Sequence, residues 1–86
     1  MEKLSDLCNI GTEVERQLHV VGIDTYEQLK VMGSKQAWLK IKAMDPSACI
    51  HRLYALQGAI EGINKSNLSK ETKEELKEFY DSMKNI

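Results

Sequence analysis

The stretch LCNIGTEVERQLHVVGIDTYEQL, residues 7–29, decides the fold, because it contains two predicted helix starts and two predicted helix ends. Apolar residues recur in it every three or four positions, which predicts helices rather than strands. It has the form of short helices joined by a tight turn at Asn9, Ile10 and Gly11. In many proteins such a turn binds a nucleic-acid phosphate through its backbone amides. This turn is therefore a candidate phosphate-binding site.

The residues at the ends of this stretch predict the boundaries of the first two helices. Asn9 tolerates a left-handed backbone, so we expect it to end a short helix over residues 4–8. Thr12 and Glu15 have the spacing of a capping box, in which each side chain accepts a hydrogen bond from a free backbone amide. The second helix is therefore expected to begin near Thr12.

The next boundary is the segment LHVVGIDTYEQ, residues 18–28. Gly22 is expected to end the second helix in a left-handed conformation, with Leu18 and Ile23 in contact as a Schellman motif requires. Thr25 and Gln28 then have capping-box spacing and predict the start of a third helix.

Similar signals divide the rest of the chain. Gly33 is expected to end the third helix and Ser34 to cap the fourth. Asp45 followed by Pro46 predicts the start of a fifth helix that runs to about Ile63. A sixth helix follows, capped by Ser69, and we expect its apolar residues to dock on the core. Those residues are Leu76, Phe79, Tyr80 and Met83.

Composition fits one folded domain over residues 1–86, an all-α bundle of five to six short helices. The chain is 42% hydrophobic and 29% charged, which is typical of a globular protein. No apolar run reaches the roughly 20 residues of a membrane span, and the amino terminus does not resemble a signal peptide. We therefore expect a cytoplasmic protein that does not bind a membrane.

Cysteine and histidine residues give no metal-site pattern. Cys8 and Cys49 lie far apart without CxxC spacing, so we expect two buried free thiols rather than a disulfide. Cys49 and His51 diverge on a helix, and His19 lies in another element, so four tetrahedral ligands are not expected to meet. No nucleophile has a recognisable base and orienting group, so we predict no cofactor, no metal and no enzymatic activity.

The predicted fifth helix has one face of small residues, which includes two glycines. Glycine inside a helix costs about 1 kcal/mol relative to alanine, so its presence predicts a close backbone approach. The approaching element is either another helix of the same chain or a second copy in a homodimer. The residues of this face are Ala55, Gly58, Ala59 and Gly62.

Taken in order, the segments NIG (9–11), VGIDTYEQL (21–29), MGSKQAWLKIKAMDP (32–46) and LYALQGAIEGI (53–63) resemble the TfoX C-terminal domain. This module occurs in bacterial regulators of natural competence and DNA transformation. The resemblance covers nearly the whole chain. It implies a compact helical fold related to helix-hairpin-helix and SAM-like domains, and a regulatory role without catalysis. It does not bring a set of functional residues.

The turn at residues 9–11 is a poor match to a phosphate-binding turn. Such turns use glycines on both sides of an apolar residue, whereas this turn has Asn9 before Gly11. Glu13 and Glu15 follow directly, and Arg16 is the one cation beside them. Residues 1–33 sum to a charge of -3, which repels a polyanion.

A more basic surface is predicted on the fourth helix. Lys35, Trp38 and Lys42 share one face, with Lys40 beside them, and an aromatic ring flanked by lysines can stack on bases or meet an acidic partner. The alternative is that Trp38 belongs to the core and lysine stems cover its edge. The residues singled out for nucleic-acid or partner contact are Asn9, Gly11, Thr12, Lys35, Trp38, Lys40 and Lys42.

Two hypotheses follow from the sequence. The first is a regulatory module that acts through protein contacts, with a binding face on the last three predicted helices and homodimerisation left open. The second is weak DNA binding through the turn and the lysines of the fourth helix, which the net charge of -1 disfavours.

Overall fold

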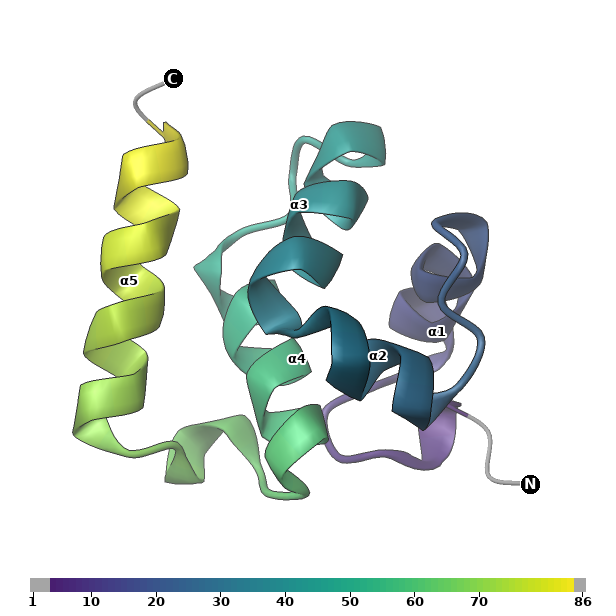
Figure 1. Ribbon diagram of the computed structural model, residues 1–86, viewed down its shortest axis with the longest axis horizontal. Coiled ribbons are helices and arrows are strands. Elements are labelled where there is room, and N and C mark those ends of the chain that lie inside the picture. The colour runs from purple at the N-terminus through teal and green to yellow at the C-terminus, as the bar shows by residue number, and fades with distance from the viewer. Residues whose placement is uncertain (1–3, 85–86) are drawn as a thin grey trace.

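The computed structural model describes residues 4–84 of the chain, and its regular elements are all helical (Figure 1). Over these residues there are five α-helices and two single-turn 3-10 helices, so the all-α prediction is confirmed. None of these helices is both long enough and apolar enough to cross a lipid bilayer. The elements are η1 (Leu4–Asp6), α1 (Thr12–Val20), α2 (Tyr26–Met32), α3 (Ser34–Met44), α4 (Ile50–Glu61), η2 (Lys65–Asn67) and α5 (Lys70–Lys84).

Helices α3 and α4 occupy the centre of the bundle, with α5 along one side and α1 with η1 on the other (Figure 1). All five α-helices contribute buried apolar side chains to a single core, and packing of this kind supplies most of the stability of helices in proteins. The buried side chains include Leu4, Leu18, Ile23, Leu29, Trp38, Ile41, Leu53, Leu56, Leu68 and Leu76.

The left-handed conformation predicted at Asn9 and the helix end predicted at Gly22 are confirmed by the backbone geometry. Asn9 has a φ of 69°, in the left-handed region. Gly22 has a φ of 89°, and the amide of Ile23 donates to the carbonyl of Leu18 at 2.8 Å. The amide of Gly22 donates to the carbonyl of His19 at 3.1 Å, which completes the Schellman motif.

One of the two predicted capping boxes is present. The amide of Gln28 donates to the Thr25 hydroxyl at 3.1 Å, and the Gln28 side chain accepts from the Thr25 amide at 3.2 Å. The prediction of a capping box at Thr12 was wrong, because α1 begins at Thr12 and no side chain caps its start. The Glu15 carboxylate accepts instead from the amide of Ser5 at 2.9 Å, which joins η1 to α1.

The predicted starts of the fourth and fifth helices were wrong. Ser34 is buried as the first residue of α3, and its hydroxyl donates to the Gln57 side chain at 2.6 Å instead of capping the helix. Asp45 accepts from the Ser47 amide at 3.0 Å and so stabilises a turn. Helix α4 begins only at Ile50, because this turn separates it from α3.

The chain also departs from the prediction at two helix ends. The helix expected over residues 4–8 is the single 3-10 turn η1, which ends at Asp6. Helix α4 ends at Glu61 rather than Ile63, because Gly62 adopts a left-handed conformation with a φ of 75°. This glycine is a helix terminator and not part of a helix face.

Helix α5 docks on the core, as predicted. The Ser69 hydroxyl accepts from the Thr72 amide at 3.1 Å and caps its start. The rings of Phe79 and Tyr80 lie over Trp38, with centroid distances of 6.1 and 5.5 Å. The apolar face of α5 consists of Leu76, Phe79, Tyr80 and Met83.

Candidate functional site

The side chain of Asn9 points into the protein rather than toward a ligand. Its amide nitrogen donates to the carbonyl oxygens of Ile63 at 3.0 Å and Ala55 at 3.4 Å. Its amide oxygen accepts from the backbone amide of Lys65 at 3.0 Å. Asn9 therefore fastens the turn before α1 to the end of α4, and its side chain is fully occupied there.

The other predicted turn residues, Gly11 and Thr12, are exposed at the start of α1 in acidic surroundings. The first turn of α1 contains Glu13 and Glu15. Arg16 donates to Glu13 at 2.7 Å, and this hydrogen bond lowers the pKa of Glu13. The cation nearest the turn is thus already paired with a carboxylate, which leaves little to attract a phosphate.

The lysines of α3 are also largely engaged by the chain. Lys35 forms an ion pair with Glu75 at 3.0 Å, and Lys42 donates to the carbonyl of Pro46 at 2.7 Å. Trp38 is 1% exposed, and its indole N–H donates to the carbonyl of Cys49 at 3.2 Å. Trp38 therefore belongs to the core, and Lys40 is the exposed lysine of this set.

The small-residue face of α4 is covered by the same chain. Ala55, Gly58 and Ala59 are buried, whereas Gly62 ends the helix. A Cβ atom at position 58 would overlap the side-chain amide of Asn9 and the backbone that follows α4. The close approach expected at Gly58 is made by an asparagine side chain, so the buried part of this face is not accessible to a second copy.

The two cysteines are free, as expected, but both are exposed, so the prediction of buried thiols was wrong. Cys49 lies just before α4, where its carbonyl and not its side chain faces the core. Among residues 4–84, no group of three or more histidine, cysteine, aspartate or glutamate side chains is placed to hold a metal ion.

A polar cluster that the sequence analysis did not find joins α1, the turn after α3, and α4. Gln17 is 3% exposed, and its side chain donates to the Asp45 carboxylate at 2.8 Å and accepts from the Arg52 guanidinium. Hydrogen bonds from Ser47 and Gln17, with Arg52 at 3.7 Å, lower the pKa of Asp45 to about 2. Local spacing gives no signal for this cluster, because its members are far apart in the sequence.

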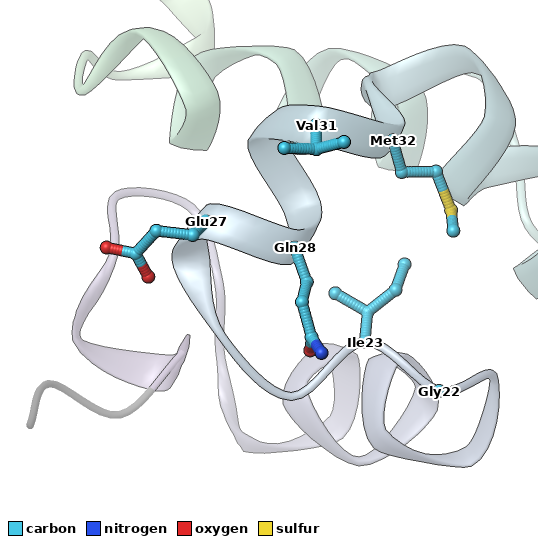
Figure 2. A pocket seen from close by; sticks show the side chains of 6 residues that line it. All are labelled: Gly22, Ile23, Glu27, Gln28, Val31 and Met32. Carbon is cyan, nitrogen blue, oxygen red and sulfur yellow. The ribbon is translucent and has the colours of Figure 1, made fainter.

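A groove of about 430 Å³ lies between the end of α1 and helix α2. Figure 2 shows Ile23 and Met32 facing the same space, with Val31 on the helix above it and the Glu27 carboxylate directed away to the side. Val31 is 88% exposed, and Val20 at the end of α1 is 61% exposed. The groove is lined by Gly22, Ile23, Glu27, Gln28, Val31 and Met32.

The sequence contained one sign of this groove. Leu29 and Met32 are three positions apart and point toward the core side of α2, whereas Val31 falls outside that spacing. An aliphatic residue outside the apolar stripe of a short helix is left on the surface.

Comparisons with known proteins identify the family to which the chain is similar. A sequence model of the TfoX C-terminal domain matches residues 1–80. The chain is 34% identical to Protein Sxy of Escherichia coli (strain K12) over 82 residues, which is 95% of this chain and 39% of that protein. The chain thus spans well under half of Protein Sxy.

Two crystal structures from Listeria monocytogenes are similar throughout. One, of an uncharacterized protein in a triclinic form, has a TM-score of 0.95 and 44% identity, and covers 96% of this chain and 94% of that one. The other, of a protein of unknown function in a tetragonal form, has a TM-score of 0.90 and 46% identity, and covers 93% and 98%. With the family match over residues 1–80, these similarities establish that the chain belongs to the TfoX C-terminal domain family.

Proposed function

We propose that this domain is a non-catalytic regulatory module that acts through protein contacts in competence and DNA transformation. Membership of the TfoX C-terminal domain family supports the regulatory role. The observation that supports protein contact is the groove beside Val31, where an aliphatic side chain is 88% exposed next to an apolar hollow. Apolar surface gathered around a hollow is typical of an interaction site.

The binding surface in this proposal differs from the one expected on the last three helices. The aromatic and small residues of α3, α4 and α5 are used for packing within the chain. Helices α1 and α2 carry the exposed aliphatic residues, Val20 and Val31. Partner contact therefore centres on α1 and α2.

Transformation of the native bacterium tests the role. Deletion of the gene is expected to lower the frequency of transformation by added DNA, and the wild-type gene is expected to restore it. Val31→Asp is expected not to restore it, because a charge would enter the groove without disturbing the core. Met44→Asp, a change at an exposed apolar residue of α3, is the matched control and is expected to restore it. An unchanged frequency after deletion would refute the competence role.

DNA binding is tested separately by the fluorescence anisotropy of a labelled generic duplex at about 50 and about 200 mM salt. We expect no saturable binding at either concentration, because Lys35 and Lys42 are engaged and the turn before α1 is acidic. Saturable binding that weakens steeply with salt and is lost in Lys40→Glu would support DNA binding as the function in place of protein contact.

A further inference from the structure

We propose that the groove between α1 and α2 binds a basic amphipathic segment of another protein. An aliphatic side chain of that segment would pack against Val31 and Met32, and a neighbouring lysine or arginine would pair with Glu27. This inference rests on the proposed function and adds the chemistry of the partner.

The apolar part of the groove fits an aliphatic side chain. Ile23 is fully buried at its floor, and Met32 lines one side (Figure 2). Val31 is exposed at its rim and would lose its contact with water only when a partner covers it. Methionine adapts to differently shaped apolar partners, which suits a wall that receives an incoming chain.

The charge around the groove selects a cationic partner. Glu27 is exposed at its edge and forms no ion pair with the residues that the structure describes. Asp24, next to Ile23, is also exposed, but its carboxylate already contacts His19 Nδ1 at 2.7 Å. Lys30, three residues after Glu27 on α2, lies toward the Tyr26 ring, with its ammonium 5.9 Å from the ring centroid.

The helix ends beside the groove are already capped. The carbonyls of Leu18 and His19 accept from the amides of Ile23 and Gly22, and the carbonyl of Leu29 accepts from the amide of Gly33. The charge that a partner would meet at the lining of the groove is that of the Glu27 carboxylate. Lysine or arginine beside the entering aliphatic side chain would therefore be attracted, and a glutamate or aspartate there would be repelled.

A second copy of the chain fits the groove less well than a different protein. Arg16 and Val20 on α1 are one exposed basic and apolar pair, but Arg16 is already paired with Glu13. Another is Lys40 with Met44, one turn apart on α3. Contact between that pair and the groove of another copy would use two different surfaces. Such head-to-tail contacts continue from copy to copy into filaments unless the ring closes. Regulation by a discrete complex is better served by a separate partner.

Nuclear magnetic resonance titration of the whole chain tests the inference. The probe is a helical peptide with leucine at the a and d positions of each heptad and lysine elsewhere, and the matched control peptide has glutamate in place of lysine. The lysine peptide is expected to shift the amide signals of Gly22, Ile23, Val31 and Met32, and the glutamate peptide is expected not to. Binding is expected to weaken as salt increases.

Variants decide whether the groove is responsible. Val31→Asn, which removes the apolar contact without adding charge, is expected to raise the Kd for the lysine peptide at least about tenfold, and Glu27→Lys to weaken the lysine peptide and admit the glutamate peptide. Met44→Asp is expected to leave the Kd unchanged. Each variant is first compared with the wild type by its spectrum, so that loss of folding is not mistaken for loss of binding.

Three results would overturn the inference. The first is no shift of the groove signals, and the second is a shift centred on the lysine-lined hollow of Lys70, Lys73 and Lys77 between α4 and α5. The third is concentration-dependent self-association of the chain that Met44→Asp abolishes. The lysine peptide could leave the groove signals unshifted while Val31→Asp still abolishes transformation. In that case the proposed function stands and the partner of the groove is not basic.

Discussion

At the scale of single residues, the side chain of Asn9 forms hydrogen bonds within the chain and none of its polar groups is directed toward a ligand. Its residue type predicts the left-handed backbone, and its position in the turn at residues 9–11 makes its side chain a candidate for contact with a phosphate. The structure directs that side chain to the carbonyl of Ile63 and the amide of Lys65. A group that is polar and suitably placed for an anion is instead used to close the fold.

Substitution of Asn9 separates the contributions of its side chain and its backbone. Asn9→Gly removes the side-chain hydrogen bonds but keeps the left-handed backbone, and should lower the free energy of unfolding by about 2 kcal/mol. Asn9→Ala should lower it by about 1 kcal/mol more, because alanine is strained at a φ of 69°. Urea unfolding followed by far-ultraviolet circular dichroism measures both. Equal stabilities of the two variants would contradict the backbone part of this account.

The close approach of the Asn9 side chain to Gly58 can be tested by substitution at Gly58. Gly58→Ala should destabilise the wild-type chain, because the added methyl group would overlap the Asn9 side chain. In the Asn9→Gly background the cost should be smaller, and a double-mutant cycle measures the difference. Additive effects would show that the two residues are not coupled.

At the scale of helices, identical sequence signals gave different outcomes. Thr12 with Glu15 and Thr25 with Gln28 have the same capping-box spacing, yet only the second pair forms a box. Glu15 is drawn away by the backbone amide of Ser5, ten residues earlier. A motif read from spacing alone cannot include such a competitor.

The two threonines form a matched pair for measurement. Thr25→Ala should lower the free energy of unfolding by about 1 kcal/mol, because it removes the hydrogen bond to the Gln28 amide. Thr12→Ala should change it by less than about 0.5 kcal/mol, because the Thr12 side chain caps nothing. Thermal or urea unfolding distinguishes the two. A Thr12→Ala effect as large as that of Thr25→Ala would restore the predicted box at α1.

Most helices were predictable because their apolar spacing and end residues act locally. The docking of α5 followed from its apolar stripe, and the end of α1 followed from Gly22. The start of α4 was misplaced because Asp45 and Pro46 fit either a helix start or a turn. Ser34 was misassigned because its partner, Gln57, lies 23 residues away.

At the scale of the whole molecule, long-range polar contacts hold the bundle in register. Gln17, Asp45 and Arg52 come from three separate parts of the chain and satisfy one another in a partly buried position. Long-range partners also explain why the candidate site was hard to predict. Lys35 was selected by residue type, but its pairing with Glu75 depends on where α5 docks.

The ionised form of Asp45 makes stability depend on pH. Its pKa is about 2 in the folded chain against an ordinary value of 3.8, so the folded state favours the carboxylate. This contribution is complete above about pH 4 and is lost as the pH falls toward about 2. Asp45→Asn cannot ionise, so the difference in urea midpoint between wild type and variant should shrink between about pH 5 and about pH 2.

The control for this prediction is Glu78→Gln, a change at an exposed carboxylate of α5. Its urea midpoint should follow that of the wild type over the whole range. A constant difference between wild type and Asp45→Asn at every pH would show that Asp45 acts by shape and not by charge.

The bond between Asn9 and the Lys65 amide joins positions 56 residues apart. During translation, α1 and its preceding turn leave the ribosome long before Lys65 is synthesised. The nascent chain therefore cannot close this corner until α4 and the residues after it have emerged. A synthesis that stalls before residue 65 would leave the amino-terminal helices open to chaperones and proteases.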